Sequence, residues 1–181
     1  MDFQQSTSST KVFFKQFIDD FFHMGAILPS SRALARAGVA YLPHRSGPIR
    51  VLEAGAGTGA FTREIVPLLQ SGDSLDVVEI NPNLMQHLKR RFETEAEFQL
   101  KPGIEVNFIS DDIRRLPPQR YHYIVFSLPL TNFPPAMVRE ILELMVHSLE
   151  SGGVFSYVKY IFVSRLKYWF GRRATRAQMK A

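Results

Sequence analysis

Residues 51–59 constrain the fold of this chain more than any other stretch. They read Val-Leu-Glu-Ala-Gly-Ala-Gly-Thr-Gly, a short apolar strand followed by three glycines at alternate positions. Glycines, which lack a Cβ atom, let the backbone turn sharply and approach a ligand closely. A helical pattern begins directly afterwards, and its first N–H groups would face the same ligand. Glu53 at the strand tip argues against a phosphate-binding loop, because a carboxylate repels a pyrophosphate but attracts a cationic amine or a ribose hydroxyl.

The chain around this loop alternates between strand and helix patterns, which is typical of a parallel α/β sheet. We expect strands at 49–53, 74–80, 105–109, 121–127 and 154–161, and helices at 11–24, 32–41, about 59–70, 83–92 and 136–149. The predicted fold is a Rossmann-like α/β domain, with a mostly parallel sheet flanked by helices and an N-terminal helical extension. Its predicted divisions are a helical cap at 1–48, the sheet domain at 49–162 and a basic helical tail at 163–181.

Composition excludes several kinds of protein. The chain has no Cys, so it forms no disulfide and no thiolate metal site. No His, Asp and Glu set has metal-ligand spacing, and we expect no metal. The polar first ten residues predict no secretory signal, and no apolar run approaches the roughly 20 residues of a membrane span.

Charge is unevenly placed along the chain. The net charge is +5, yet residues 151–181 hold seven Lys or Arg and no acid, so the first 150 residues carry a net charge of −2. A basic end indicates a polyanionic partner, either anionic lipid head groups or nucleic acid, although a solvated tail has the same composition.

The expected helix at 11–24 is rich in phenylalanine on one face. An aromatic amphipathic helix can lie in the interface of a bilayer or dock on its own domain, and periodicity alone leaves both open. The candidate membrane-contact residues are Phe13, Phe14, Phe17 and Phe21.

Acidic residues end the next two predicted strands. Glu79 closes the second strand, where a carboxylate can accept both hydroxyls of a ribose. Asp111 and Asp112 close the third strand, where one carboxylate can accept the exocyclic amine of an adenine and the other can cap a turn. Ile80 or Ile113 would sandwich the base. The set predicts an adenosine-containing ligand. A dinucleotide fingerprint also fits the loop, so Glu53 is what favours a cationic cofactor.

The glycine loop, Glu79 and the Asp pair, in this order at three successive strand tips, resemble the class I S-adenosylmethionine-dependent methyltransferases over residues 49–162. The resemblance implies S-adenosyl-L-methionine as cofactor, with the loop on its methionine part, Glu79 on the ribose and Asp111 on the adenine. The fold of that class normally ends in two further strands, for which this chain shows no convincing pattern. The predicted cofactor-binding set is Glu53, Gly55, Ala56, Gly57, Thr58, Gly59, Phe61, Glu79, Ile80, Asn81, Asp111, Asp112 and Ile113.

Two flanking stretches resemble the bacterial phospholipid N-methyltransferases. They are Gly-Ala-Ile-Leu-Pro-Ser-Ser-Arg from residue 25 and Leu-Pro-Leu-Thr-Asn-Phe-Pro from residue 128. The resemblance implies methylation of phosphatidylethanolamine towards phosphatidylcholine. It also implies an N-terminal helix attached to anionic membrane, and hence a cytoplasmic protein peripherally associated with the inner face of the membrane.

Methyl transfer to a lipid amine requires a neutral nitrogen, so a proton must leave it. The candidate catalytic residues are Ser127, Leu128 and Pro129 after the fourth strand, where backbone carbonyls can orient the amine, and Tyr41 before the first strand. Sequence leaves the general base and the oligomeric state undetermined.

Two other functions stay open. The rRNA adenine N6-dimethyltransferases share the loop and the acids, and hold a flipped adenine with an Asn-Leu-Pro-Tyr tetrad. The tetrad here is Ser127-Leu128-Pro129-Leu130, which lacks both the amide and the aromatic ring, so nucleic acid is the less favoured partner. A cofactor-binding module without turnover is the other alternative.

Overall fold

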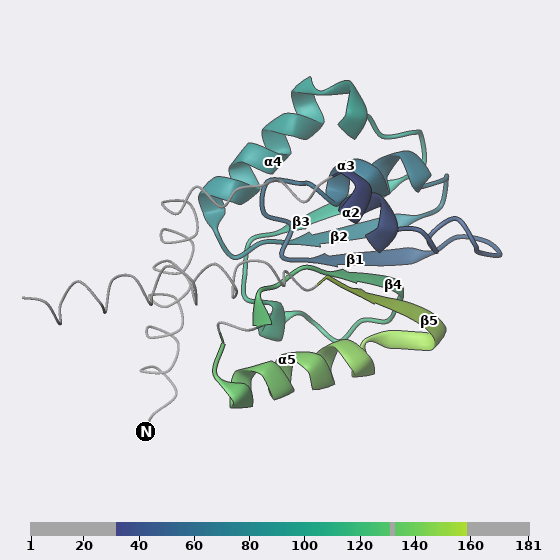
Figure 1. Ribbon diagram of the computed structural model, residues 1–181. Helices are drawn as coiled ribbons and strands as arrows, with labels where there is room; N and C mark the ends of the chain where they lie inside the picture. Colours follow the sequence, from purple (N-terminus) through teal and green to yellow (C-terminus); the bar gives the residue numbers. More distant parts are fainter. Residues whose placement is uncertain (1–31, 131–132, 159–181) are drawn as a thin grey trace, which may run out of the picture.

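The computed structural model describes residues 32–130 and 133–158 (Figure 1). Its centre is a parallel sheet of five strands in the order β3-β2-β1-β4-β5. The expected membrane helix at 11–24 and the basic tail at 163–181 lie outside the described residues. The strands are β1 (Arg50–Ala54), β2 (Ser74–Val78), β3 (Glu105–Ile109), β4 (Tyr121–Phe126) and β5 (Leu149–Tyr157).

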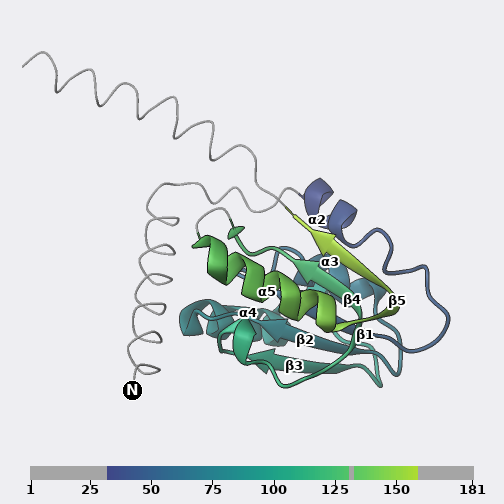
Figure 2. The same ribbon diagram turned by 90° about the horizontal axis from the view of Figure 1, so that it is seen from below.

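Helices cover both faces of this sheet. On one side lie α2 (Arg32–Gly38), α3 (Thr62–Ile65) and α4 (Pro82–Thr94), and on the other lies α5 (Pro135–His147) (Figures 1 and 2). Alternate residues of each strand point to opposite faces. Val51 therefore packs in the core under α2, α3 and α4, and its neighbour Leu52 packs in the core under α5. The Rossmann-like α/β arrangement expected from the sequence is confirmed.

The central strand β1 lies at the point where the strand order reverses. Ala54, its last residue, pairs with Val78 of β2 on one side and with Phe126 of β4 on the other. All five strands are parallel, so their carboxyl ends meet at one edge of the sheet. In open α/β sheets this switch point is where ligands bind.

The expected strands 1 to 4 are found within two residues of their predicted ends, whereas two other elements differ. The helix after the glycine loop is a single α-turn, Thr62–Ile65, continued by a 3₁₀ turn, η1 (Val66–Leu68), and not a helix to residue 70. Pro67 accounts for this change, because it has no N–H group to continue an α-helical ladder.

The start of β5 is the second difference. The strand begins at Leu149 and not at 154, so the predicted turn at 151–153 lies inside it. The pairing shifts register there: Tyr121 pairs with Leu149, whereas Tyr123 pairs with Val154. Extra residues on β5 are accommodated as a bulge, and Gly152 with φ +76° lies within it. Smaller differences are the end of α2 at Gly38 and two further 3₁₀ turns, η2 (Ala96–Phe98) and η3 (Ile113–Arg115).

Candidate functional site: the glycine loop at the carboxyl edge

The loop after β1 depends on left-handed glycines. Gly55, Gly57 and Gly59 have φ values of +82°, +57° and +83°. The N–H groups of Gly55 and Ala56 both donate to the carbonyl of Val78, at 2.9 and 3.1 Å, so the loop turns over the end of β2. A Cβ atom added to Gly57 would meet nothing within 4 Å. The middle of the loop therefore faces open space on which a ligand can lie.

The two outer glycines are packed tightly instead. A Cβ atom on Gly55 would lie 2.5 Å from Leu128 of the segment after β4. A Cβ atom on Gly59 would lie 2.5 Å from Leu88 of α4 and 3.3 Å from the ring of Phe98. Glycine is needed at these two positions both for backbone conformation and for close approach.

Glu79 follows β2 and reaches the loop directly. Its Oε2 accepts the Gly57 N–H at 2.8 Å, and its Oε1 accepts the Asn81 N–H at 2.8 Å. The side chain is buried, with 6% exposure. Burial raises the pKa of Glu79, opposed by the hydrogen bonds from Asn81, Gly57 and Ile80. The structure thus joins this acid and the glycine loop at one point.

Glu53 lies beneath the loop. It is fully buried, and it accepts the N–H of Thr62 at 3.1 Å on Oε1 and contacts the Thr62 hydroxyl at 2.7 Å on Oε2. Burial raises its pKa to about 8, against the lowering effect of Thr62 and with a further rise from the Glu79 charge. Burial thus favours the protonated form of Glu53, whose carboxyl group joins the end of β1 to the start of α3 through Thr62.

The predicted loop residues that follow Gly57 have different surroundings. Thr58 is half-buried, and Phe61 is 2% exposed in the core, where its ring limits the space beside Gly38 of α2. Phe61, which the sequence predicts at the cofactor, thus lies against α2 in the structure.

The two aspartates after β3 have separate roles in the structure. Asp112 caps η3 through the Arg114 N–H at 3.0 Å and binds the Arg114 guanidinium with both oxygens, which lowers its pKa against the effect of burial. The Asp111 side chain is 47% exposed, and its contacts are the Asp112 N–H at 2.7 Å and Arg115 at 3.6 Å. Ile80 is half-buried and Ile113 is buried. Asn81 caps α4 by accepting the N–H groups of Asn83 and Leu84.

The candidate catalytic residues after β4 lie beside the loop. The Ser127 hydroxyl donates to the carbonyl of Gly55 at 2.6 Å, and the Ser127 N–H donates to Ala54 at 3.1 Å. Leu128 is 9% exposed, and its carbonyl accepts the Leu130 N–H at 2.9 Å. Pro129 is half-buried. The structure therefore brings this segment and the glycine loop together.

Tyr41 is placed elsewhere. Its backbone hydrogen-bonds the hydroxyl of Tyr123, a residue three positions before the end of β4, and its ring lies 6.2 Å from that of His44. The side chain is 66% exposed. These contacts do not bring Tyr41 to the carboxyl edge.

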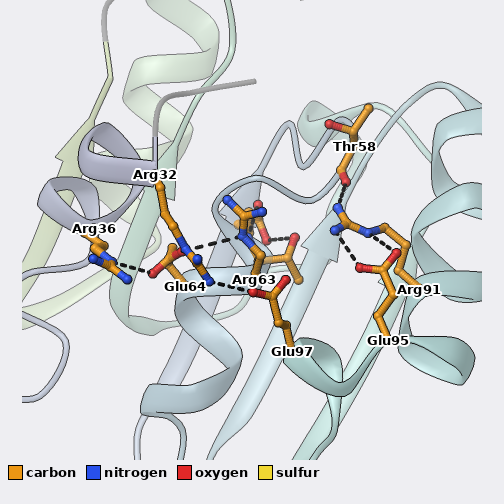
Figure 3. A network of polar contacts seen from close by, with 10 residues as sticks. Arg32, Arg36, Thr58, Arg63, Glu64, Arg91, Glu95 and Glu97 are labelled. Atoms are coloured by element: carbon orange, nitrogen blue, oxygen red, sulfur yellow. Dashed lines mark hydrogen bonds and ion pairs between the residues drawn. The ribbon is translucent and has the colours of Figure 1, made fainter. Parts of the chain in front are cut away.

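Sequence reasoning missed Arg91 of α4, which binds the loop from its outer side (Figure 3). Its Nη1 donates to the carbonyl of Thr58 at 2.5 Å across 33 residues. The i, i+4 spacing of Arg91 and Glu95 was readable as a helical ion pair, but no pattern in the sequence indicates the contact with Thr58.

The comparisons with known proteins agree with this geometry. The sequence model of a methyltransferase domain matches residues 51–153, more than half of the chain, and the protein belongs to this family. Its cofactor is S-adenosyl-L-methionine. The residues present fit such a cofactor, because the open face of Gly57 lies directly beside the buried carboxylate of Glu79.

Individual relatives differ in their named acceptors. The chain is 27% identical to ornithine lipid N-methyltransferase of Singulisphaera acidiphila over 146 residues, 78% of this chain and 75% of that protein. It is 33% identical to ribosomal RNA small subunit methyltransferase A of Methylococcus capsulatus over 88 residues, 49% of this chain and 32% of that protein. Magnesium protoporphyrin IX methyltransferase of Synechocystis with bound SAM shares the fold, with a TM-score of 0.52 and 18% identity over 66% of this chain and 54% of that one.

Within residues 32–130 and 133–158, no cluster of three or more His, Cys, Asp or Glu could hold a metal ion. None of the described helices is long and apolar enough to cross a membrane.

Proposed function

We propose that this protein transfers methyl groups from S-adenosyl-L-methionine to the amine of phosphatidylethanolamine at a membrane surface, towards phosphatidylcholine. The observation that carries the proposal is the segment after β4, whose Leu128 lies against Gly55 of the glycine loop. Leu128 and Leu130 are buried, with 9% exposure each, in the apolar cluster that also holds Ile141 of α5. The similarity to an ornithine lipid N-methyltransferase supports an amine-bearing lipid as acceptor.

Two polar groups of this segment already have hydrogen-bond partners within the protein. The Ser127 hydroxyl hydrogen-bonds Gly55, and the Leu128 carbonyl accepts a hydrogen bond from Leu130. Residues 127–130 present no side-chain amide and no aromatic ring, the two groups that would hold a flipped adenine. This composition suits a small amine on a lipid head group better than a nucleobase.

An apolar acceptor site beside this segment would assist the proton loss that the reaction requires. An amine moved from water to an apolar site has a lower pKa, because desolvation disfavours the ammonium form. The cofactor supplies an electrophilic methyl group on a sulfonium, and the protein's part is alignment and exclusion of water. Glu53 is fully buried under the loop and bonded to Thr62, so we do not assign it as the base that takes the proton.

We assign the cofactor contacts as follows. Gly55, Ala56, Gly57, Thr58 and Gly59 form the surface under the methionine part. The Glu79 carboxylate accepts the ribose hydroxyls and keeps its bond with the Gly57 N–H. Asp111 takes the adenine amine, because its side chain is exposed and its ion pair with Arg115 is long. Asp112 holds η3 through Arg114, with Ile80 and Ile113 beside the base.

Membrane contact completes the proposal. We assign it to Phe13, Phe14, Phe17 and Phe21 of the expected helix at 11–24, assisted by the basic residues of 163–181 near acidic lipids. The protein would then lie on the cytoplasmic face of the membrane, and the segments 1–48 and 163–181 would flank the methyltransferase domain as a membrane-contact cap and tail.

A nucleic-acid acceptor is the second candidate. The similarity to a ribosomal RNA methyltransferase over 49% of this chain favours it, as does the basic C-terminal segment, which could bind phosphates. The two candidates differ in the partner that the full chain must bind.

Membrane partition separates them. The full chain should pellet with vesicles of phosphatidylethanolamine and phosphatidylglycerol, and Phe17→Glu with Phe21→Glu should abolish pelleting, because the apolar face of the helix is then charged. The matched control is Gln16→Glu with His23→Glu on the polar face, which adds two carboxylates and should retain most of the binding. Equal pelleting of both double variants, or binding to RNA but not to vesicles, would contradict the lipid assignment.

A further inference from the structure

Arg91 makes three contacts at once with groups beside the glycine loop. Its Nη1 donates to the Thr58 carbonyl, while Nε and Nη2 donate to the two oxygens of Glu95 at 2.8 and 2.7 Å (Figure 3). The guanidinium carbon lies 4.3 Å from the centre of the Phe98 ring. A bidentate carboxylate and an aromatic face fix the plane of a guanidinium, so the hydrogen bond to Thr58 has a set direction.

The carbonyl that Arg91 holds belongs to the open part of the loop. Thr58 follows Gly57, whose N–H donates to Glu79, and precedes Gly59, whose N–H donates to Ala56. Arg91 of α4 thus holds the carbonyl of Thr58, while Glu79 holds the N–H of the preceding residue, Gly57. The orientation of the N–H groups in this turn depends on both contacts.

Apolar side chains that neighbour Arg91 also pack against the glycine loop. The Phe98 ring stacks on Arg91 and also lies against Gly59, where an added Cβ atom would come within 3.3 Å of it. Leu88 of α4 lies against Gly59 as well, 2.5 Å from the same added Cβ atom. Helix α4 begins at Pro82, three residues after Glu79. One rigid element therefore connects the acid after β2 with the outer side of the loop.

We propose that Arg91 is a positioning residue for S-adenosyl-L-methionine: it holds the Thr58 peptide so that the glycine loop has its binding conformation before the cofactor arrives. Without it, the left-handed glycines at 57 and 59 leave the loop free to adopt other turns, and ordering it would oppose binding. The proposal concerns the cofactor, and it stands whether the acceptor is a lipid or a nucleic acid.

The test is cofactor affinity measured by titration calorimetry on the full chain, well below the thermal midpoint of each variant. Arg91→Ala should weaken binding of S-adenosyl-L-methionine by about tenfold. Arg91→Lys should recover part of the loss, because an ammonium can still donate to Thr58. Arg90→Ala is the matched control, because it removes the same charge from an exposed neighbouring position on α4 and should leave affinity unchanged.

A purely structural role makes a different prediction. In that case Arg91→Ala would lower the melting temperature but leave the affinity at low temperature equal to wild type, and this result would overturn the proposal. Should Arg91→Ala fail to fold, Glu95→Gln and Arg91→Lys serve instead, and wild-type affinity in both would overturn it equally. In a methyl-transfer assay, KM for the cofactor should rise while kcat at saturation is unchanged. Failure of the wild-type chain to bind S-adenosyl-L-methionine would instead contradict the cofactor assignment itself.

Discussion

At the scale of single residues, two glutamates at neighbouring strand ends have different tasks. Glu53 is fully buried and bonded to Thr62, whereas Glu79 accepts the backbone N–H groups of Gly57 in the glycine loop and Asn81 at the start of α4. Reasoning from sequence treated both as groups that face the cofactor, because an acid at the end of a β-strand gives no sign of how deeply its side chain is buried. In the structure Glu79 contacts the glycine loop directly, and Glu53 connects β1 to α3, so we propose Glu79 for the cofactor.

The raised pKa of Glu53 predicts a pH-dependent stability. Its pKa is about 8 in the folded chain against an ordinary value of 4.5, so between these pH values the folded state binds up to one proton more than the unfolded state. The free energy of unfolding should then fall as pH rises, by at most about 1.4 kcal/mol per pH unit. Glu53→Gln should reduce this slope, because the amide resembles the protonated acid and does not titrate.

Urea unfolding followed by circular dichroism at pH 5, 6, 7 and 8 measures this slope. Part of it should remain in Glu53→Gln, because burial raises the pKa of Glu79 as well and acts in the same direction. Identical slopes for Glu53→Gln and wild type would show that Glu53 is ionised in the folded protein.

Removal of the Glu79 carboxylate tests the ribose assignment. Glu79→Ala should weaken S-adenosyl-L-methionine binding by roughly 1–3 kcal/mol, because the ribose hydroxyls and the Gly57 N–H lose their acceptor. Calorimetric titration gives this value, with Glu93→Ala as control, an exposed acid on the same α4. Unchanged affinity in Glu79→Ala would refute the role assigned to this residue.

At the scale of elements, strands and long helices were predictable and tertiary contacts were not. The strand β3 was predicted at its observed bounds, 105–109, because its flanking turn residues and β-branched pattern are local signals. The bulge in β5 was not foreseen, because glycines at 152 and 153 also fit a turn, and only pairing with β4 decides between them.

The candidate site shows the same division. The order of glycine loop, Glu79 and Asp pair was readable, because parallel strands place their carboxyl ends at one edge. The hydrogen bond between Arg91 and Thr58 spans 33 residues and depends on how α4 packs beside the loop. Likewise, a serine at a strand end does not indicate that its hydroxyl donates a hydrogen bond to the Gly55 carbonyl.

Element contacts also fix the start of the described chain. Arg32 at the first turn of α2 donates to Glu64 at 3.1 Å and to Glu97 at 2.5 Å, and Arg36 donates to Glu64 at 3.1 Å (Figure 3). These pairs are exposed and contribute little individually. Together with the contact between Gly38 and Phe61, they hold α2 over α3, on the opposite face of the sheet from α5.

At the scale of the whole molecule, the residues assigned to the cofactor and those assigned to the acceptor follow strands on opposite sides of β1. The acids assigned to the adenosine part follow β2 and β3 on one side, and the segment assigned to the acceptor, residues 127–130, follows β4 on the other. The strand order reverses at this point, so the glycine loop lies between these two groups of residues. The central claim is that the acceptor placed there is the amine of phosphatidylethanolamine.

Mass spectrometry of extracted lipids tests that claim most directly. The full chain is incubated with S-adenosyl-L-methionine and vesicles of phosphatidylethanolamine and phosphatidylglycerol, with Glu79→Ala as control. The account predicts phosphatidylethanolamine carrying one or more added methyl groups with the wild-type chain, and strongly reduced amounts with the variant. A chain that binds S-adenosyl-L-methionine and pellets with the vesicles but leaves every lipid unmethylated would contradict it, and would favour a binding module or another acceptor.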